Sequence, residues 1–140
     1  MAEDEQQQYD PMYEINYMRS LLESIDNQMN TLSRGLEELK RAFYVLKDQN
    51  IETSPETRVS IGAGIFANAK VETEKDLLVP IGSSIYVEEN KDKTIERLDN
   101  NIKEVENSLT GMGNQRAEIS NRYQTLLSLV QQQGSGEDQE

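Results

Sequence analysis

The 140-residue sequence contains no cysteine, no histidine and no tryptophan. Without cysteine there is no disulfide framework and no thiolate chemistry, which is compatible with a reducing compartment. Without histidine, nucleophile–histidine pairs and histidine-ligated metal sites are excluded. The sequence has no run of about 18 apolar residues, so it predicts no membrane span. Its first ten residues are acidic, and we expect no signal peptide there.

Basic residues are also scarce, because 14 lysines and arginines accompany 26 acidic residues, for a formal net charge of −12. This charge disfavours nucleic-acid phosphates and anionic membranes as partners. The acidic residues are spread over the chain, with no spacing typical of paired catalytic carboxylates. The sequence therefore predicts no enzyme, no cofactor and no metal site, in a chain long enough for one domain.

Two segments carry the alternating spacing of three and four residues that is typical of coiled-coil helices. The first comprises Ile15, Met18, Leu22, Ile25, Met29, Leu32, Leu36, Leu39, Phe43 and Leu46. The second comprises Ile95, Leu98, Ile102, Val105, Leu109, Met112, Arg116, Ile119, Tyr123, Leu126 and Val130. Most other positions are polar, whereas a surface helix of a globular protein has a wider apolar stripe. We predict two long helices, over residues 10–50 and 92–131.

The 48 residues between the two seams can return the chain, so that the helices can pair antiparallel within one molecule. If the end of the first seam at Leu46 lies beside the start of the second seam at Ile95, the residue numbers of paired positions sum to about 141. Arg116, the polar member of the second seam, then lies opposite Ile25. Glu23 and Asp26 are close by, so we expect a partly exposed charge pair that fixes the register.

Between the predicted helices, apolar residues alternate with other residues, which is typical of strands with one buried face. VSIGAGIFA at 59–67 and VPIGSSIYV at 79–87 repeat one pattern, so we predict two β-hairpins over residues 57–89. A four-stranded sheet made from them would keep a bare apolar face, because the coil uses the apolar residues of the helices. Such a face requires a partner. The predicted assembly residues are Val59, Ile61, Ile65, Val79, Ile81, Ile85 and Val87.

Gly62, Gly64 and Ala67 spell G-x-G-x-x-A, a tolerated form of the dinucleotide-binding fingerprint. A dinucleotide site needs a helix that begins at the second glycine, but the residues after Gly64 alternate like a strand. The second copy of the repeat has Gly82-Ser83-Ser84 instead, so the copies do not share a phosphate contact. We interpret these glycines as hairpin turns.

The order of a long helix, two tandem hairpins and a long returning helix resembles the α-type subunit of the prefoldin family. VSIGAGIFANAKV, DLLVPIGSSIYVEEN and the heptads from Thr94 carry the resemblance, which covers roughly residues 10–130. It implies a mainly α fold with small β content, in which an antiparallel coiled coil has two hairpins at one end. It also implies that these hairpins join a β-barrel in an assembly of two α-type and four β-type subunits.

The resemblance further implies an ATP-independent cytoplasmic holdase, which captures unfolded client proteins and delivers them to a group II chaperonin. The alternative is a structural coiled-coil adaptor that oligomerises through its hairpins. A holdase must expose apolar residues near the free end of the coil, where an antiparallel seam is expected to fray. The candidate client-binding residues, all outside the seam, are Met12, Tyr13, Tyr17, Leu21, Leu127 and Leu129.

Tyr9, Tyr13 and Tyr17 recur every four residues, which places them on one side of the first helix. Two interpretations stay open from the sequence. The three rings either pack at a helix edge against the neighbouring helix or form a stripe that binds a partner.

Overall fold

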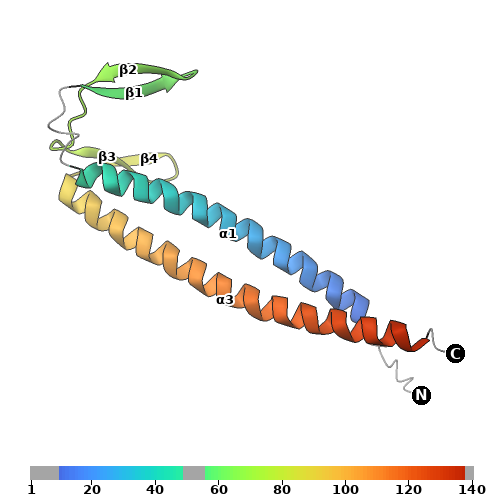
Figure 1. Ribbon diagram of the computed structural model, residues 1–140. Coiled ribbons are helices and arrows are strands. Elements are labelled where there is room, and N and C mark those ends of the chain that lie inside the picture. The colour runs from blue at the N-terminus through green and yellow to red at the C-terminus, as the bar shows by residue number, and fades with distance from the viewer. Residues whose placement is uncertain (1–9, 49–55, 138–140) are drawn as a thin grey trace. The chain divides into compact units, whose positions relative to one another are not determined.

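The computed structural model describes residues 10–48 and 56–137. The order of its elements is α1 (Pro11–Lys47), β1 (Thr57–Gly62), β2 (Ile65–Ala69), β3 (Leu77–Gly82), β4 (Ile85–Glu89) and α3 (Lys91–Glu137) (Figure 1). The predicted class of two long helices and two small antiparallel hairpins is confirmed. Helix α1 ends at Lys47, before the end predicted at residue 50, and α3 continues to Glu137, beyond the end predicted at residue 131.

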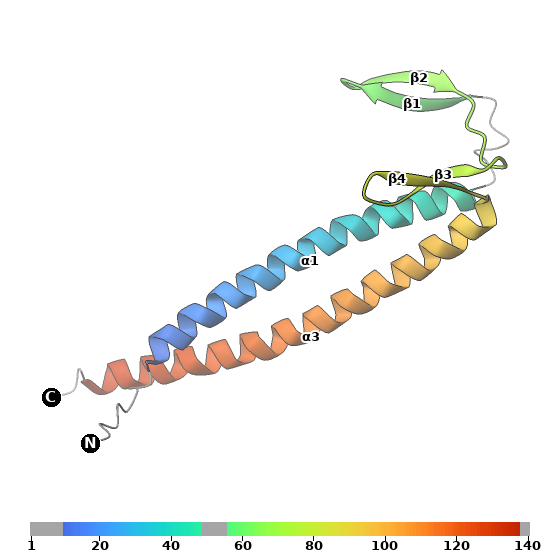
Figure 2. The ribbon, with the colours of Figure 1, turned by 180° about the vertical axis from the view of Figure 1, so that it is seen from behind.

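The chain divides into two compact units. One, here called the helical unit, consists of residues 1–33 and 108–140, and the other, the hairpin unit, consists of residues 34–107. The helical unit contains the first part of α1 and the last part of α3, which lie side by side and antiparallel (Figures 1 and 2). Neither helix, over the part of the chain that the structure describes, has an apolar stretch that could cross a bilayer.

Both helices begin at a side-chain cap. The Asp10 carboxylate accepts a hydrogen bond of 3.0 Å from the backbone N–H of Met12, and Pro11 fills the first helical position, where a missing N–H costs nothing. Before α3, the side-chain oxygen of Asn90 accepts a bond of 2.9 Å from the Lys93 N–H. These caps place the helix starts at Pro11 and Lys91.

Every seam position of both helices is buried or half-buried. In the helical unit, Ile15, Met18 and Leu126 form a buried cluster, against which four further residues pack. These are Ile119, Tyr123, Leu127 and Val130. Ile15 is only 1% exposed, so the seam is packed at the start of α1. Packing of both helices around Ile15 closes this end of the seam.

The hairpin unit holds two separate two-stranded antiparallel sheets, β1 with β2 and β3 with β4. The single four-stranded sheet considered from the sequence is therefore wrong. Alternation identifies the strands and their faces, but it does not determine which strands pair. Pro80 in β3, opposite Tyr86, has no N–H to donate, and proline is found on edge strands for this reason.

Each hairpin turns through two residues with positive φ. Ala63 and Gly64 have φ of 51° and 73°, and Ser83 and Ser84 have φ of 51° and 60°. Both residues with positive φ are typical of the type I′ turns that match the twist of hairpin strands. Strand β2 begins directly at Ile65, so the interpretation of the G-x-G-x-x-A stretch as a hairpin turn is confirmed.

A polar junction connects the end of β4 to the first turns of α3. The Glu89 carboxylate is buried and accepts two hydrogen bonds from the Arg97 guanidinium, at 2.5 and 3.2 Å. These bonds, and a further one from Thr94, lower the pKa of Glu89 although burial opposes the shift. The ion pair anchors the second hairpin to the helix that follows it.

Candidate functional site

The off-seam residues of the helical unit divide into an exposed and a half-buried group. The side chains of Tyr13 and Tyr17 are 75% and 60% exposed, and those of Met12 and Leu129 are about half exposed. Leu21 and Leu127 are half-buried, and Leu127 packs against the Ile15 cluster. These four exposed side chains, here called the exposed apolar group, face outward while the seam beneath them is closed.

Tyr13 and Tyr17 on α1 are largely exposed to solvent. Packing of Tyr13 and Tyr17 at a helix edge against the neighbouring helix is therefore wrong, and the open alternative of an outward stripe agrees with their exposure. Tyr9 lies outside the described residues. An exposed tyrosine offers a large apolar ring and a hydroxyl to a partner at a small cost in side-chain entropy.

Two polar contacts that the sequence reading missed hold α1 against α3 beside the exposed apolar group. Arg122 pairs with Glu14 at 2.7 Å, and the Arg19 guanidinium donates a hydrogen bond of 3.2 Å to the Tyr123 hydroxyl. The numbers of paired positions are predicted to sum to about 141, which places residue 19 next to residues 122 and 123. The contact between Arg19 and Tyr123 could therefore have been predicted by applying this sum to positions that flank the seam.

The charge pair predicted at the seam edge is present. Arg116 contacts Asp26 through two hydrogen bonds of 2.5 and 3.2 Å, and the two side chains are 43% and 46% exposed. The hydrogen bond from Arg116 lowers the pKa of Asp26, and the same contact raises the pKa of Arg116. The contact confirms the antiparallel register that the seams predict.

The hairpins expose apolar side chains over most of their length. Of the predicted assembly residues, five are exposed by 39% to 67%: Val59, Ile61, Ile65, Ile81 and Ile85. Val79 and Val87 are half-buried within the second hairpin. Phe66, Leu78 and Tyr86, at the alternate strand positions, are also exposed. An isolated two-stranded hairpin is marginally stable in water, so these faces require a covering partner.

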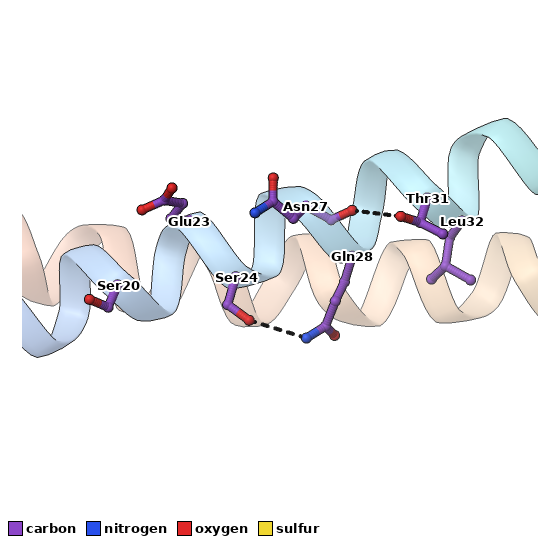
Figure 3. A pocket seen from close by; sticks show the side chains of 7 residues that line it. All are labelled: Ser20, Glu23, Ser24, Asn27, Gln28, Thr31 and Leu32. Carbon is purple, nitrogen blue, oxygen red and sulfur yellow. Dashed lines mark hydrogen bonds between the residues drawn. The ribbon is translucent and has the colours of Figure 1, made fainter.

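A shallow groove runs along α1 in the helical unit. It is lined by Ser20, Glu23, Ser24, Asn27, Gln28, Thr31 and Leu32 (Figure 3). Six of its seven side chains are uncharged, and two side-chain hydrogen bonds run along the helix. Gln28 donates to the Ser24 hydroxyl at 3.3 Å, and the Thr31 hydroxyl donates to the Asn27 carbonyl at 3.1 Å. Among the described residues, no group of three or more acidic side chains could hold a metal ion.

Known proteins resemble this chain in sequence and in fold. Residues 18–135 match the family described as prefoldin subunit. Prefoldin subunit alpha from Thermoplasma acidophilum is 36% identical over 115 residues, which cover 82% of this chain and 88% of that protein. The subunit alpha from Archaeoglobus fulgidus is 30% identical over 130 residues, covering 85% and 95% of the two chains.

A solved structure shares the fold at low sequence identity. It is that of a filamentous PFD from Methanocaldococcus jannaschii, determined by cryo-electron microscopy, with a TM-score of 0.65 and 17% identity. The match covers 81% of this chain and 95% of that chain. The coiled seams, the paired hairpins and these matches together show that the chain belongs to the prefoldin subunit family of chaperones, where its curated relatives are alpha subunits.

Proposed function

We propose that this chain is the α-type subunit of a cytoplasmic, ATP-independent holdase. The hairpins join β-type subunits in an assembly of two α and four β chains, whose central body is a β-barrel. The helical unit captures unfolded proteins and releases them to a group II chaperonin. The observation that carries this proposal is the exposed apolar group, Met12, Tyr13, Tyr17 and Leu129, which lies outside a seam that is already closed.

The closed seam supports the holdase over a coiled coil that only spaces its partners. A coiled coil that only spaces its partners gains nothing from exposed tyrosines next to a cluster as tightly packed as that around Ile15. Burying apolar area contributes about 25 cal/mol per Å², so each exposed ring offers a client a moderate gain. Methionine adapts its shape to different clients, and tyrosine combines apolar area with a hydroxyl.

Assembly follows from the hairpin faces. Both two-stranded sheets leave apolar side chains uncovered, and each leaves outer strand edges unpaired within the described residues. Strands added from neighbouring subunits cover the apolar faces and also pair with the backbone N–H and C=O groups at the strand edges, as closure into a barrel does. Several subunits then present their helical units to one client, and many weak contacts give avidity without a tight single site. Release needs no ATP because such contacts exchange one at a time.

The test replaces the exposed apolar group by serine, in a variant carrying Met12→Ser, Tyr13→Ser, Tyr17→Ser and Leu129→Ser. Substitution is preferable to truncation because it leaves the Ile15 cluster intact. Variant and parent chains are each assembled with the same β-type subunit, and assembly is verified by size-exclusion chromatography with light scattering. The measured quantity is the protection of a diluted, denatured protein against aggregation. We expect the variant to assemble normally and to protect less.

A matched control carries Tyr44→Ser, which removes one exposed tyrosine from α1 in the hairpin unit, where Tyr44 is 65% exposed. The control should protect the client as well as the parent chain does. If the serine variant protects equally well, the exposed apolar group does not bind clients, and the coiled-coil adaptor becomes the better account of the chain. A second assay, transfer of a bound client to a group II chaperonin without nucleotide, tests delivery separately.

A further inference from the structure

The outward face of α1 in the helical unit has few of the charges that usually cover the outside of a coiled coil. Of the three outward heptad positions from residue 13 to residue 31, one carries Asn16, Glu23 and Asn30, and the other two carry Tyr13, Tyr17, Ser20, Ser24, Asn27 and Thr31. The last six are all exposed, and none of them is charged. Four of them line the groove of Figure 3. The tyrosines and the groove thus form one continuous surface, here called the outer face.

The helical unit, to which the outer face belongs, has a negative net charge. Over residues 10–33 and 108–137, which the structure describes, this unit has six acidic residues, three arginines and no lysine, and all seven lysines of the chain belong to the hairpin unit. Each of the three arginines already contacts a partner within the helical unit. Arg19 bonds to Tyr123, Arg116 to Asp26 and Arg122 to Glu14. The groove itself carries a single charged side chain, the exposed carboxylate of Glu23.

We propose that the outer face binds an extended client segment in which an apolar residue is followed closely by lysine or arginine. This inference rests on the proposed function and specifies the client chemistry. The apolar residue packs on the ring of Tyr17, and the cation pairs with the Glu23 carboxylate. The hydroxyl and amide side chains of the groove bond to the backbone of the segment, since each can donate and accept.

The spacing of the two anchors fits an extended chain. Tyr17 and Glu23 are about 120° apart around the helix, because six residues make one and two-thirds turns, and about 9 Å apart along its axis. An extended segment covers that length in about three residues at roughly 3.3 Å each. The tyrosine rings also attract a neighbouring cation through their negative faces. Acidic segments meet a net negative charge here, and like-charge contacts disfavour association and slow the encounter.

Two labelled peptides test the proposal. Both have leucine and phenylalanine at the same positions, and one carries lysine where the other carries glutamate. Fluorescence anisotropy with the complex assembled from this chain and a β-type subunit gives each dissociation constant. We expect the basic peptide to bind at least about tenfold more tightly at low salt, and the difference to shrink with added salt because the charges are exposed.

Matched variants locate the effect on the outer face. Glu23→Gln should weaken binding of the basic peptide about two- to fivefold, the range of an exposed ion pair. Glu118→Gln removes the same charge from α3 of the same unit and should leave that affinity unchanged. Ser24→Lys introduces a cation into the groove, whereas Ser33→Lys introduces one at an exposed serine that does not line it. Only the first lysine should repel the basic peptide strongly.

Three results would overturn the inference, and they differ in what else they affect. If both peptides bind equally and the serine substitutions of the exposed apolar group weaken both, client binding stands but the preference for cations is wrong. If neither peptide binds and those substitutions also leave client protection unchanged, the proposed function fails as well. Equal effects of Glu23→Gln and Glu118→Gln would show that the net charge acts from a distance, and would remove the outer face as the binding surface.

Discussion

Replacing Ile15 by alanine should open the helical unit without disturbing the hairpins. Ile15 is 1% exposed, the most deeply buried side chain described, and its cluster includes Met18 and Leu126. Truncating a buried isoleucine to alanine costs about 2–5 kcal/mol. Two effects place the cost near the lower end. Alanine is the better helix former by a few tenths of a kcal/mol, and the flexible Met18 can fill part of the space.

We therefore expect Ile15→Ala to reduce the local free energy of opening by about 2 kcal/mol. Amide hydrogen exchange of the assembled complex measures this quantity segment by segment. Exchange should accelerate in residues 11–33 and 108–134, while the hairpins retain their protection. The control is Leu129→Ala, because Leu129 is half exposed and such surface substitutions usually change stability by less than about 0.5 kcal/mol.

The outcome that would refute this reasoning is equal exchange in the two variants. Ile15 would then contribute no more than an exposed residue, and the packing around it could not be what closes this end of the seam. Acceleration confined to the hairpins would contradict the division into two compact units.

Three further substitutions test the turns and the charge pairs. Ser84→Gly should stabilise the second hairpin by about 1 kcal/mol. Ser84 has a φ of 60° at the position where the first hairpin has Gly64, and only glycine adopts that region without strain. A lower thermal midpoint of the variant would contradict this. Arg116→Leu should leave the thermal midpoint unchanged or raise it, because an apolar residue completes the seam while an exposed ion pair contributes little; a large loss would show that the pair with Asp26 is essential. Glu89→Gln should destabilise the protein at neutral pH, and the difference should vanish on acidification. The folded pKa of Glu89 is lowered, so the stabilisation by its ionised carboxylate is present above the ordinary pKa of about 4.5 and is lost as the pH falls through the lowered value. Thermal unfolding followed by circular dichroism measures the difference in stability between variant and parent. A difference that stays constant with pH would rule this out.

The sequence determined the elements of this protein because their signals are local and periodic. A heptad seam fixes which face of a helix is buried, whatever the partner, and every predicted seam position is buried or half-buried. The alternation of apolar with other residues and the repeated turn residues located the four strands. These signals are local, because the positive φ at Gly64 and the hydrogen bonds across a two-residue turn involve only residues close in sequence. Even the register could be predicted, because two seams of matched length align in few ways.

Tertiary structure decided which separate pieces meet. The hairpins form two sheets rather than one, a choice between pairings that the alternating pattern permits equally. The Glu89–Arg97 junction and the contacts of Arg19 and Arg122 depend on where long side chains reach in three dimensions. The outward direction of Tyr13 and Tyr17 was open from the sequence, because a four-residue spacing shows that side chains share a helix face but not what that face contacts. Packing around Ile15 settles it by turning the seam inward and leaving the tyrosines exposed.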